Sequence, residues 1–411
     1  MSSKKFLKNI FLNNSSQGLQ FGSRWIFNIT LINVLDIGTY GVFSFVYSIS
    51  NTLLAVIPFG SPVFLINEVD DLKASKNKLL DSFWVASILF LGLLAIYLIL
   101  NLFLENIKGW NYVGYGVLLG FVLSLNMILF SFFKGVGDFA KELRAYTVFF
   151  LCLIAFIAYL FFFETSIKNI HFIFGVLIGI NALVFFLTFF SNKMLFQSTS
   201  LKDISQSRKR IKKAFSKRKY FGFQEIATAV YTQSGMLLLF YLLDENTYGY
   251  YRALFVIISP LFLFTVALSQ VVLNYLKKQD RKSMISNFRK IQVFSFLIGV
   301  AAVLVLFFLK DFIFKVIKVP TTQDIIIAFK LVLATALLRF IFSNYEMLII
   351  IYDKQKYRFY AVLVIAVINI ILVFSLLPQY GIIGAVLTNF ISYLLLLTGL
   401  LFITERTLKH K

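Results

Sequence analysis

Residues 79–104 decide the fold, and they read LLDSFWVASILFLGLLAIYLILNLFL. Asp81 is the single Asp, Glu, Lys or Arg residue in this stretch. The stretch is apolar on every face of a helix, and it exceeds the roughly 20 residues that cross the hydrocarbon core of a bilayer. It therefore predicts a transmembrane helix. It does not resemble the strands of a membrane barrel, which are about ten residues long and alternate between apolar and polar positions.

Eleven further runs have the same character, so that twelve spans are predicted. They lie near residues 17–35, 41–66, 111–133, 143–163, 170–192, 220–243, 250–276, 288–309, 326–351, 358–377 and 381–403. Over the whole chain of 411 residues, 59% are apolar and 14% are charged, against about 25% charged in soluble domains. A soluble fold could not bury this much apolar surface. We predict an all-α polytopic membrane protein.

The positive charge of the chain follows the predicted loops. The formal net charge is +21, from 40 Lys and Arg against 19 Asp and Glu. The N-terminus, the C-terminus and the alternate loops on their side hold 31 of the 40 basic residues, whereas the opposite loops hold 5. Because loops rich in Lys and Arg stay in the cytoplasm, we predict that both termini are cytoplasmic. Anionic membrane lipid, and not nucleic acid, is the expected partner of these loops.

The longest loop divides the chain into two halves. Residues 193–219 carry ten basic residues and one acid, Asp203. We predict a six-helix lobe over 1–192, a basic cytoplasmic linker over 193–219 and a second six-helix lobe over 220–411. Two interpretations of the linker stay open: it is held to anionic lipid, or it contacts an anionic substrate headgroup.

An internal repeat relates the two halves. The heptapeptide LDIGTYG at 35–41 matches LDENTYG at 243–249, with five of seven positions identical and an offset of 208 residues. Both copies lie in the outer loop between the first two spans of a half. Since each half has an even number of spans, the copies share one orientation. The lobes are therefore expected to be related by a parallel pseudo-two-fold axis along the membrane normal, as in transporters that alternate access between two lobes.

Polar side chains inside predicted spans are functional candidates because they are costly in hydrocarbon. The first span of each half carries such residues on one helical face, and these faces are expected to line a shared cavity. The candidates for substrate binding on these two faces are Gln20, Arg24, Asn28, Glu225, Thr228 and Thr232.

Three further candidates lie in spans 250–276 and 326–351, namely Arg252, Arg339 and Glu346. Arg339 and Glu346 share a face but are separated by roughly 10 Å along the helix axis, so no local salt bridge between them is expected. Arg339 is the deepest of these cations, and we predict that it binds an anionic headgroup together with Arg24.

Several of these residues also have a simpler interpretation. Arg252 is close enough to the outer end of its span for its guanidinium to reach the interface. Glu225 is close enough to the cytoplasmic end to be hydrated, and Arg24 could form a structural pair in place of a ligand contact. Both interpretations stay open for each residue.

No motif of enzymatic or cofactor chemistry is found in the sequence. Cys152 is the only cysteine, and neither it nor the two histidines has a partner at metal-ligand spacing. The sequence contains no Gly-rich phosphate loop and no large outer loop that could hold an active site. We expect a protein that is not an enzyme and that needs no cofactor or metal.

Three motifs in order resemble a known family. The stretch Leu243–Ala253 resembles the junction after the seventh span of bacterial polysaccharide flippases, the O-antigen and capsule repeat-unit flippases. Gly381–Ser392 resembles the opening of their last span, and Leu35–Gly41 resembles their first outer loop. These flippases belong to one superfamily with multidrug extruders and lipid II flippases.

The resemblance implies a function in surface polysaccharide biosynthesis. It implies export of an undecaprenyl-pyrophosphate-linked repeat unit across the bacterial inner membrane, with the polysaccharide polymerase complex as a further partner. The main alternative is a multidrug or other small-molecule transporter of the same fold. A sugar facilitator of the twelve-span type is disfavoured because the loop 67–73 lacks the Gly-x-x-x-Asp-Arg pattern of that class.

Overall fold

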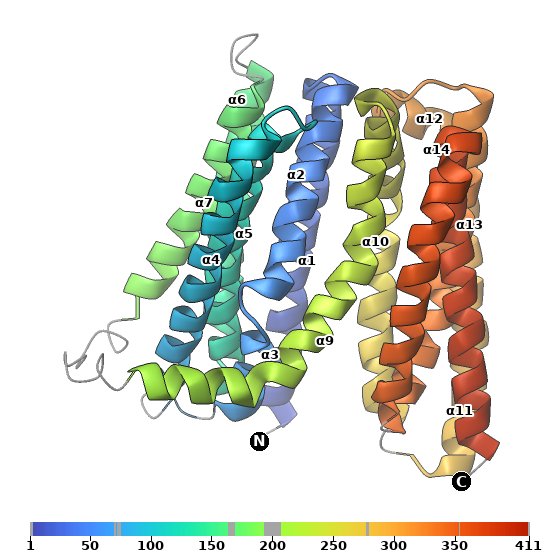
Figure 1. Cartoon of the computed structure of the whole chain (residues 1–411). Helices are drawn as coiled ribbons and strands as arrows, with labels where there is room; N and C mark the ends of the chain where they lie inside the picture. The colour runs from blue at the N-terminus through green and yellow to red at the C-terminus, as the bar shows by residue number, and fades with distance from the viewer. Residues whose placement is uncertain are drawn as a thin grey trace. The chain divides into compact units, whose positions relative to one another are not determined.

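The computed structural model describes residues 3–69, 71, 75–162, 169–192, 207–276, 279–352 and 354–409. Every regular element in these ranges is a helix (Figure 1). In chain order the helices are α1 (Ser3–Val34), α2 (Ile37–Val56), α3 (Ser61–Glu68), α4 (Lys76–Leu104), α5 (Trp110–Val136), α6 (Phe139–Phe162), α7 (Ile170–Phe190), α9 (Ser207–Leu242), α10 (Glu245–Leu276), α11 (Arg281–Phe308), α12 (Lys310–Val316), α13 (Gln323–Ile351) and α14 (Gln355–Lys409).

The helices confirm the prediction of an all-α membrane protein. Nine of the described helices are long and apolar enough to cross a membrane. Helix α14 is one of them and contains the last two predicted spans, which meet at a kink where Gly381 has φ 51°. Helices α1 and α9, which carry the polar candidates of the first span of each half, are not among the nine found in the described residues. The opening helix of each half is therefore the least suited to contact lipid on all sides.

The chain forms two compact units. The first unit holds Met1–Phe27 and Val42–Gln233, and the second holds Asn28–Gly41 and Ser234–Lys411. The borders lie within α1, α2 and α9, so the turn between α1 and α2 belongs with the second unit. The predicted lobes 1–192 and 220–411, joined by the linker 193–219, remain a prediction.

The two halves of the chain share a pattern of lipid exposure. In α4, the third predicted span of the first half, 11% of the most apolar segment is buried, and in α11, the third of the second half, the share is again 11%. In α5 it is 72%. Apolar side chains that no protein covers are stable in lipid, so α4 and α11 are suited to the outside of the bundle and α5 to its core.

The two copies of the repeated heptapeptide form matching helix caps in the second unit. Asp36 precedes α2 and accepts a hydrogen bond from the backbone N–H of Thr39 at 2.9 Å. Asp244 precedes α10 and accepts one from Thr247 at 3.0 Å. Burial raises the pKa of both carboxyl groups, but the hydrogen bonds from these threonines outweigh it and leave both pKa values below the ordinary value. The repeat thus encodes an N-cap that begins the second helix of each half.

The same two turns pack against each other through glycine. A Cβ atom at Gly249 would lie 2.1 Å from the carbonyl oxygen of Ile37, and one at Gly41 would lie 2.6 Å from that of Glu245. Real Cβ atoms do not approach oxygen this closely. Both positions therefore require glycine, because the first turns of α2 and α10 are in direct backbone contact.

Helices α2 and α3 are separated by a short joint, residues 57–60. Pro58 lacks a backbone N–H and so interrupts the helical ladder. Phe59 and Gly60 have φ of 43° and 67°, and a positive φ is unusual for a non-glycine residue. The predicted span 41–66 is consequently a broken helix, a feature that marks binding sites in many transporters.

Candidate functional site

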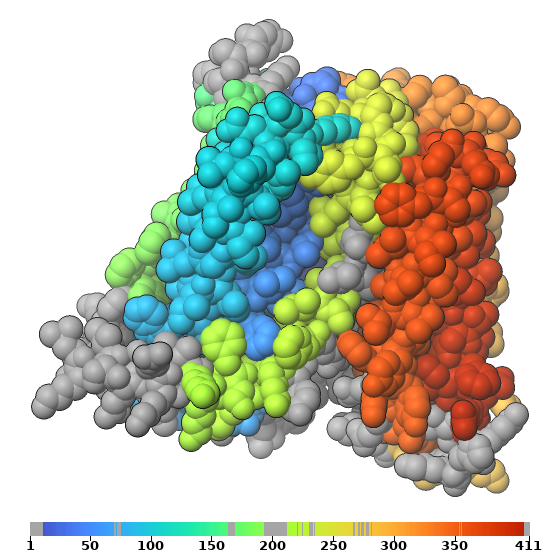
Figure 2. All heavy atoms as spheres, in the orientation of Figure 1, coloured from blue at the N-terminus to red at the C-terminus, as the bar shows by residue number. Residues whose placement is uncertain are grey.

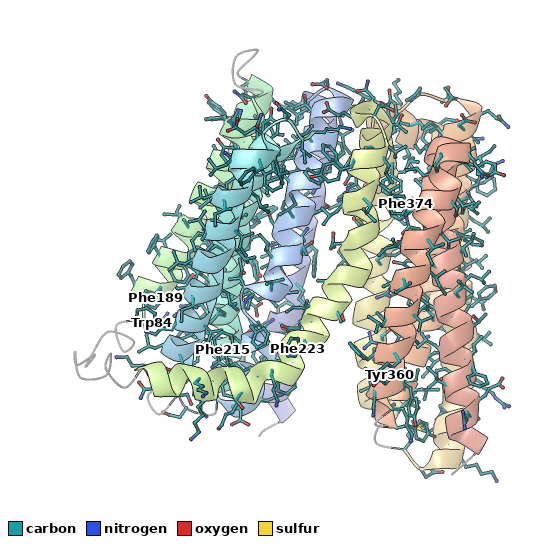
Figure 3. The ribbon with its side chains drawn as sticks, viewed as in Figure 1. Trp84, Phe189, Phe215, Phe223, Tyr360 and Phe374 are labelled. Atoms are coloured by element: carbon teal, nitrogen blue, oxygen red, sulfur yellow. The ribbon has the colours of Figure 1, made fainter. Side chains whose placement is uncertain are left out.

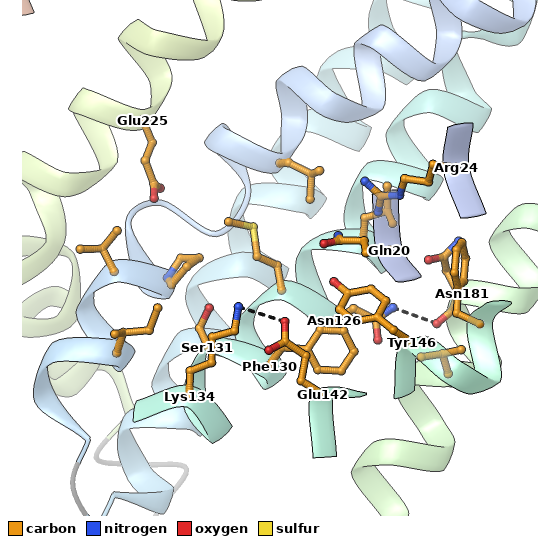
Figure 4. Close-up of a pocket in the computed structure, with 18 residues that line it drawn as sticks. Gln20, Arg24, Asn126, Phe130, Ser131, Lys134, Glu142, Tyr146, Asn181 and Glu225 are labelled. Carbon is orange, nitrogen blue, oxygen red and sulfur yellow. Dashed lines mark hydrogen bonds and ion pairs between the residues drawn. The ribbon is translucent and has the colours of Figure 1, made fainter. Parts of the chain in front are cut away.

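A cavity of about 400 Å³ with charged, polar and apolar side chains in its wall lies within the first unit (Figure 4). Helices α1, α3, α5, α6, α7 and α9 all contribute to its wall. The charged side chains in the wall are two cations and two carboxylates, and the neutral polar ones are three amides, a hydroxyl and a phenol: Arg24, Lys134, Glu142, Glu225, Gln20, Asn126, Asn181, Ser131 and Tyr146. Three of the residues selected from the sequence, Gln20, Arg24 and Glu225, thus line one cavity.

An ion pair lies in the wall of the cavity. The Nζ atom of Lys134 on α5 is 2.9 Å from Oε1 of Glu142 on α6. The Glu142 side chain is 3% exposed and that of Lys134 is 24% exposed. A carboxylate this deep needs its partner, since breaking a buried pair typically costs about 3–5 kcal/mol. Both side chains line the cavity, and Lys134 is the more accessible member of the pair.

Two asparagines supply neutral hydrogen-bonding groups. Asn126 on α5 donates from Nδ2 to the carbonyl oxygen of Asn181 on α7 at 2.9 Å, and Asn181 donates from its own Nδ2 to the carbonyl oxygen of Leu177 at 2.8 Å. Both asparagines are buried. These bonds orient each side chain and leave the Asn126 Oδ1 atom without a partner among the described residues.

Glu225 connects α9 with the joint between α2 and α3. Its Oε2 atom accepts a hydrogen bond from the backbone N–H of Gly60 at 3.1 Å. In Figure 4 its side chain points from α9 toward the loop that leads into α3. The carboxylate therefore accepts a hydrogen bond from a backbone N–H group that has no helical partner at the break between α2 and α3. This gives Glu225 a structural role in addition to any contact with a ligand.

The candidates of span 326–351 are located in the second unit, where the sequence-based expectation about Arg339 and Glu346 was wrong. The Nη1 atom of Arg339 lies 4.0 Å from Oε2 of Glu346, at the limit of an ion pair. Both side chains are long and flexible, and they extend toward each other along the helix, so their charged ends approach although their backbone positions are two turns apart. Glu346 has a nearer partner in Arg358, at 3.0 Å, and the Arg339 guanidinium lies 4.8 Å from the ring centre of Phe342.

Arg252 and Asn28 also belong to the second unit. The Arg252 guanidinium donates to the Sδ atom of Met236, a weak acceptor, and its Nε atom has no hydrogen-bond partner among the described residues. Asn28 accepts a hydrogen bond from the Tyr40 hydroxyl at 3.5 Å. The polar residues predicted on one face of the first span are thus divided between the two units. Gln20 and Arg24 lie in the first unit, and Asn28 lies in the second.

Of the two threonine candidates, the structure describes the side chain of Thr228 alone. Thr228 is exposed and is not part of the cavity wall, and the side chain of Thr232 lies outside the described residues. Within the described ranges, no three His, Cys, Asp or Glu side chains gather closely enough to hold a metal ion.

Sequence reasoning missed six charged or polar residues of the cavity, namely Asn126, Ser131, Lys134, Glu142, Tyr146 and Asn181. Asn126 and Asn181 lie within predicted spans, so the cost of a polar group in hydrocarbon was a signal that could have found them. Lys134 and Glu142 had been assigned to a cytoplasmic loop, because α5 and α6 extend further than the apolar runs alone indicate. The cavity combines two cations and two carboxylates with amide and hydroxyl groups, so that its wall offers both charged and neutral hydrogen-bonding partners to a ligand.

Comparison with protein families gives one match. The family described as "Polysaccharide biosynthesis protein" matches residues 6–273. No curated protein sequence matches the chain significantly.

Solved membrane transporters share the fold. A lipid II flippase MurJ in an inward closed conformation aligns with a TM-score of 0.69 at 18% identity, over 95% of this chain and 87% of that one. An inward-facing multidrug resistance MATE family transporter of the MOP superfamily aligns with a TM-score of 0.59 at 14% identity, over 97% of this chain and 96% of that one. A eukaryotic MATE transporter aligns with a TM-score of 0.56 at 12% identity, over 98% of this chain and 100% of that one. At these identities the likeness establishes the fold, which is that of two-lobed, twelve-span transporters.

Proposed function

Because the chain belongs to the polysaccharide biosynthesis protein family, we propose that it is a flippase for a lipid-linked oligosaccharide. The substrate is an undecaprenyl-pyrophosphate-linked repeat unit, which crosses the bacterial inner membrane by alternating access. The product supplies a surface polysaccharide such as O-antigen or capsule. Both termini are cytoplasmic in this proposal, and the polysaccharide polymerase complex and anionic lipid at the cytoplasmic loops are further partners.

The cavity of the first unit is the observation that carries the proposal. Arg24 and Lys134 supply positive charge, and a guanidinium in particular matches two phosphate oxygens at once. The amides of Gln20, Asn126 and Asn181 can donate to and accept from sugar hydroxyls.

The size of the cavity sets how the substrate is held. About 400 Å³ lies within the usual range of small-molecule sites, and it accommodates a pyrophosphate with the first sugar. The polyprenyl chain is too large to enter and remains in lipid. The candidates of the second unit, Arg252 and Arg339 with Glu346, would contact the headgroup or the outer sugars in other steps of the cycle.

The membrane potential can drive such an export. A pyrophosphate diester carries about two negative charges, and each charge that leaves a negative cytoplasm gains about 2.3 kcal/mol per 100 mV. The gain is roughly 5 kcal/mol per 100 mV for both charges. No covalent step is needed, which agrees with a transporter rather than an enzyme.

A complementation experiment tests the proposal. In a strain without the gene, lipid-linked repeat units should accumulate at the cytoplasmic face and surface polysaccharide should be lost. Wild-type protein should restore it, Arg24→Lys should restore it weakly, and Arg24→Ala should reduce export about 10–100-fold, since charge-assisted hydrogen bonds contribute about 1.5–3 kcal/mol.

A matched control separates loss of the site from loss of charge. Arg144→Ala removes an exposed cation from α6, the helix that carries Glu142, but Arg144 does not line the cavity; this variant should export normally. If the deletion strain still displays surface polysaccharide with no second flippase, the flippase proposal fails. Drug sensitivity of the same strain with intact polysaccharide would favour the small-molecule alternative.

A further inference from the structure

The first turns of α9 lie on the surface of the first unit (Figures 1 and 2). One face of this segment is buried at a spacing of four residues, by Ala214, Arg218 and Gly222. Residues four apart share one side of a helix, so the segment docks with a defined face. The docked face reaches the joint between α2 and α3 that borders the cavity.

Arg218 is the centre of the docked face. It is 1% exposed and is among the largest fully buried side chains of the described chain. Its Nη1 atom donates to Oγ of Ser61 at 2.9 Å, and its guanidinium lies 4.4 Å from the ring centre of Phe64. Burial lowers the pKa of Arg218 to about 10, with Asp81 opposing the change, so the group is still charged at neutral pH. A buried cation bound to α3 fixes the position of α9.

Backbone contacts hold the joint from the same side. A Cβ atom at Gly60 would lie 2.6 Å from the backbone nitrogen of Gly222, so these two glycines let the chains touch. The Phe59 ring packs on Phe215 and Phe223, with ring centres 5.3 and 5.6 Å apart. Any displacement of α9 would therefore release the joint, together with the hydrogen bond from Gly60 to Glu225.

The opposite face of the same segment is basic and exposed. Lys212, Lys213 and Lys217 are exposed, and the sequence from 212 to 223 contains no acid. Phe223 is 61% exposed, and Trp84 near the start of α4 is 46% exposed. Figure 3 labels both side chains on the first unit, with Trp84 on α4 and Phe223 on α9. Exposed lysines next to exposed aromatic rings are typical of a helix that lies at a membrane interface.

We propose that this lysine face binds the anionic headgroups of phospholipids at the cytoplasmic membrane surface, and that the bound lipid holds α9 against the joint between α2 and α3. The inference rests on the cytoplasmic orientation in the proposed function but not on the identity of the transported sugar. The basic segment would then regulate the joint, because lipid bound to one face of α9 stabilises the backbone contact that the other face makes with residues 57–60. Each lysine near an anionic surface strengthens binding about fivefold, so loss of all three weakens it on the order of 100-fold.

Hydrogen exchange of the joint tests the coupling. The full-length protein is placed in nanodiscs of phosphatidylcholine alone or mixed with phosphatidylglycerol, and the exchange of backbone amides in residues 57–64 is measured by mass spectrometry. Phosphatidylglycerol should slow this exchange in the wild type. It should have no effect in the triple variant Lys212→Gln, Lys213→Gln, Lys217→Gln.

Two controls make the result specific. The triple variant Lys282→Gln, Arg289→Gln, Lys290→Gln removes three exposed cations from the start of α11 in the second unit and should respond as the wild type does. Arg218→Met should still bind phosphatidylglycerol in a vesicle sedimentation assay but lose the slowed exchange, because the link to α3 is gone.

The outcomes separate this inference from the flippase proposal. Equal exchange in both lipids, or a response that survives in the α9 triple variant, would overturn it. Slowed exchange on addition of inorganic pyrophosphate to phosphatidylcholine discs, if it is lost in the α9 triple variant, would assign the lysine face to a phosphate ligand in place of lipid. Since no sugar substrate is present, failure here leaves the complementation result untouched, and failure of complementation leaves the lipid response untouched.

Discussion

The contact between the two repeated turns, at the starts of α2 and α10, predicts a graded cost of adding single methyl groups. A Cβ atom at position 249 would stand 2.1 Å from the Ile37 carbonyl oxygen, whereas ordinary contacts begin at 3.4 Å. The two helix starts would have to separate by the difference, about 1.3 Å. At Gly41 the corresponding contact is 2.6 Å, which requires about 0.8 Å. In both cases the opposing atom is backbone oxygen, which cannot rotate away.

The expected magnitudes follow from these distances. Overpacking of a tight contact typically costs about 1–3 kcal/mol, and alanine regains up to about 1 kcal/mol of helix propensity over glycine. We expect Gly249→Ala to lower the free energy of unfolding by about 2 kcal/mol and Gly41→Ala by about 1 kcal/mol. The double variant should cost less than the sum, since one separation relieves both clashes.

The assay is unfolding in sodium dodecyl sulfate, followed by tryptophan fluorescence. Gly175→Ala in α7 is the matched control, because nothing lies within 4 Å of the added Cβ atom; it should be neutral or stabilising. If Gly249→Ala unfolds within about 0.5 kcal/mol of Gly175→Ala, the backbone contact between the repeated turns is refuted, since that margin is the usual scatter of a harmless surface change.

The remaining predictions concern topology, the second unit and pH. In a Cys152→Ser background, an impermeant thiol reagent should label cysteines at 106, 168 and 379 from outside but not at 75, 205 and 355; labelling at 205 in intact cells would overturn the orientation. Arg339→Ala should abolish export and Arg339→Lys should impair it at normal protein level, whereas full export would make Arg339 structural. Asp36→Ala should cost about 1 kcal/mol at neutral pH through the lost cap. Because the folded pKa of Asp36 is lowered, that contribution is complete at neutral pH and disappears as pH falls below about 4, so the wild type and the variant should converge in acid.

Local patterns in the sequence were sufficient to predict the helical spans and the equivalent positions of the two repeated heptapeptides. A run of about 20 apolar residues has one stable conformation in hydrocarbon, a helix, because only a helix pairs every backbone group within the segment. The prediction held even for α14, where two runs meet at Gly381. The heptapeptide repeat likewise identified Asp36 and Asp244 in equivalent places, since an N-cap depends on residues within one turn.

The tertiary structure decided which polar groups share a site. Glu225 and Gly60 are 165 residues apart, and Arg218 and Ser61 are 157 residues apart, so no periodicity along the chain links them. The sequence placed Lys134 and Glu142 in a loop, whereas packing of α5 against α6 makes them a buried ion pair. A hydrogen bond or ion pair depends on distances of a few ångströms between helices, and those distances are set by the packing of many side chains at once. Hydropathy reports the environment of a segment, and for that reason it predicted the helices but not the partners of Arg218, Glu225 and Lys134.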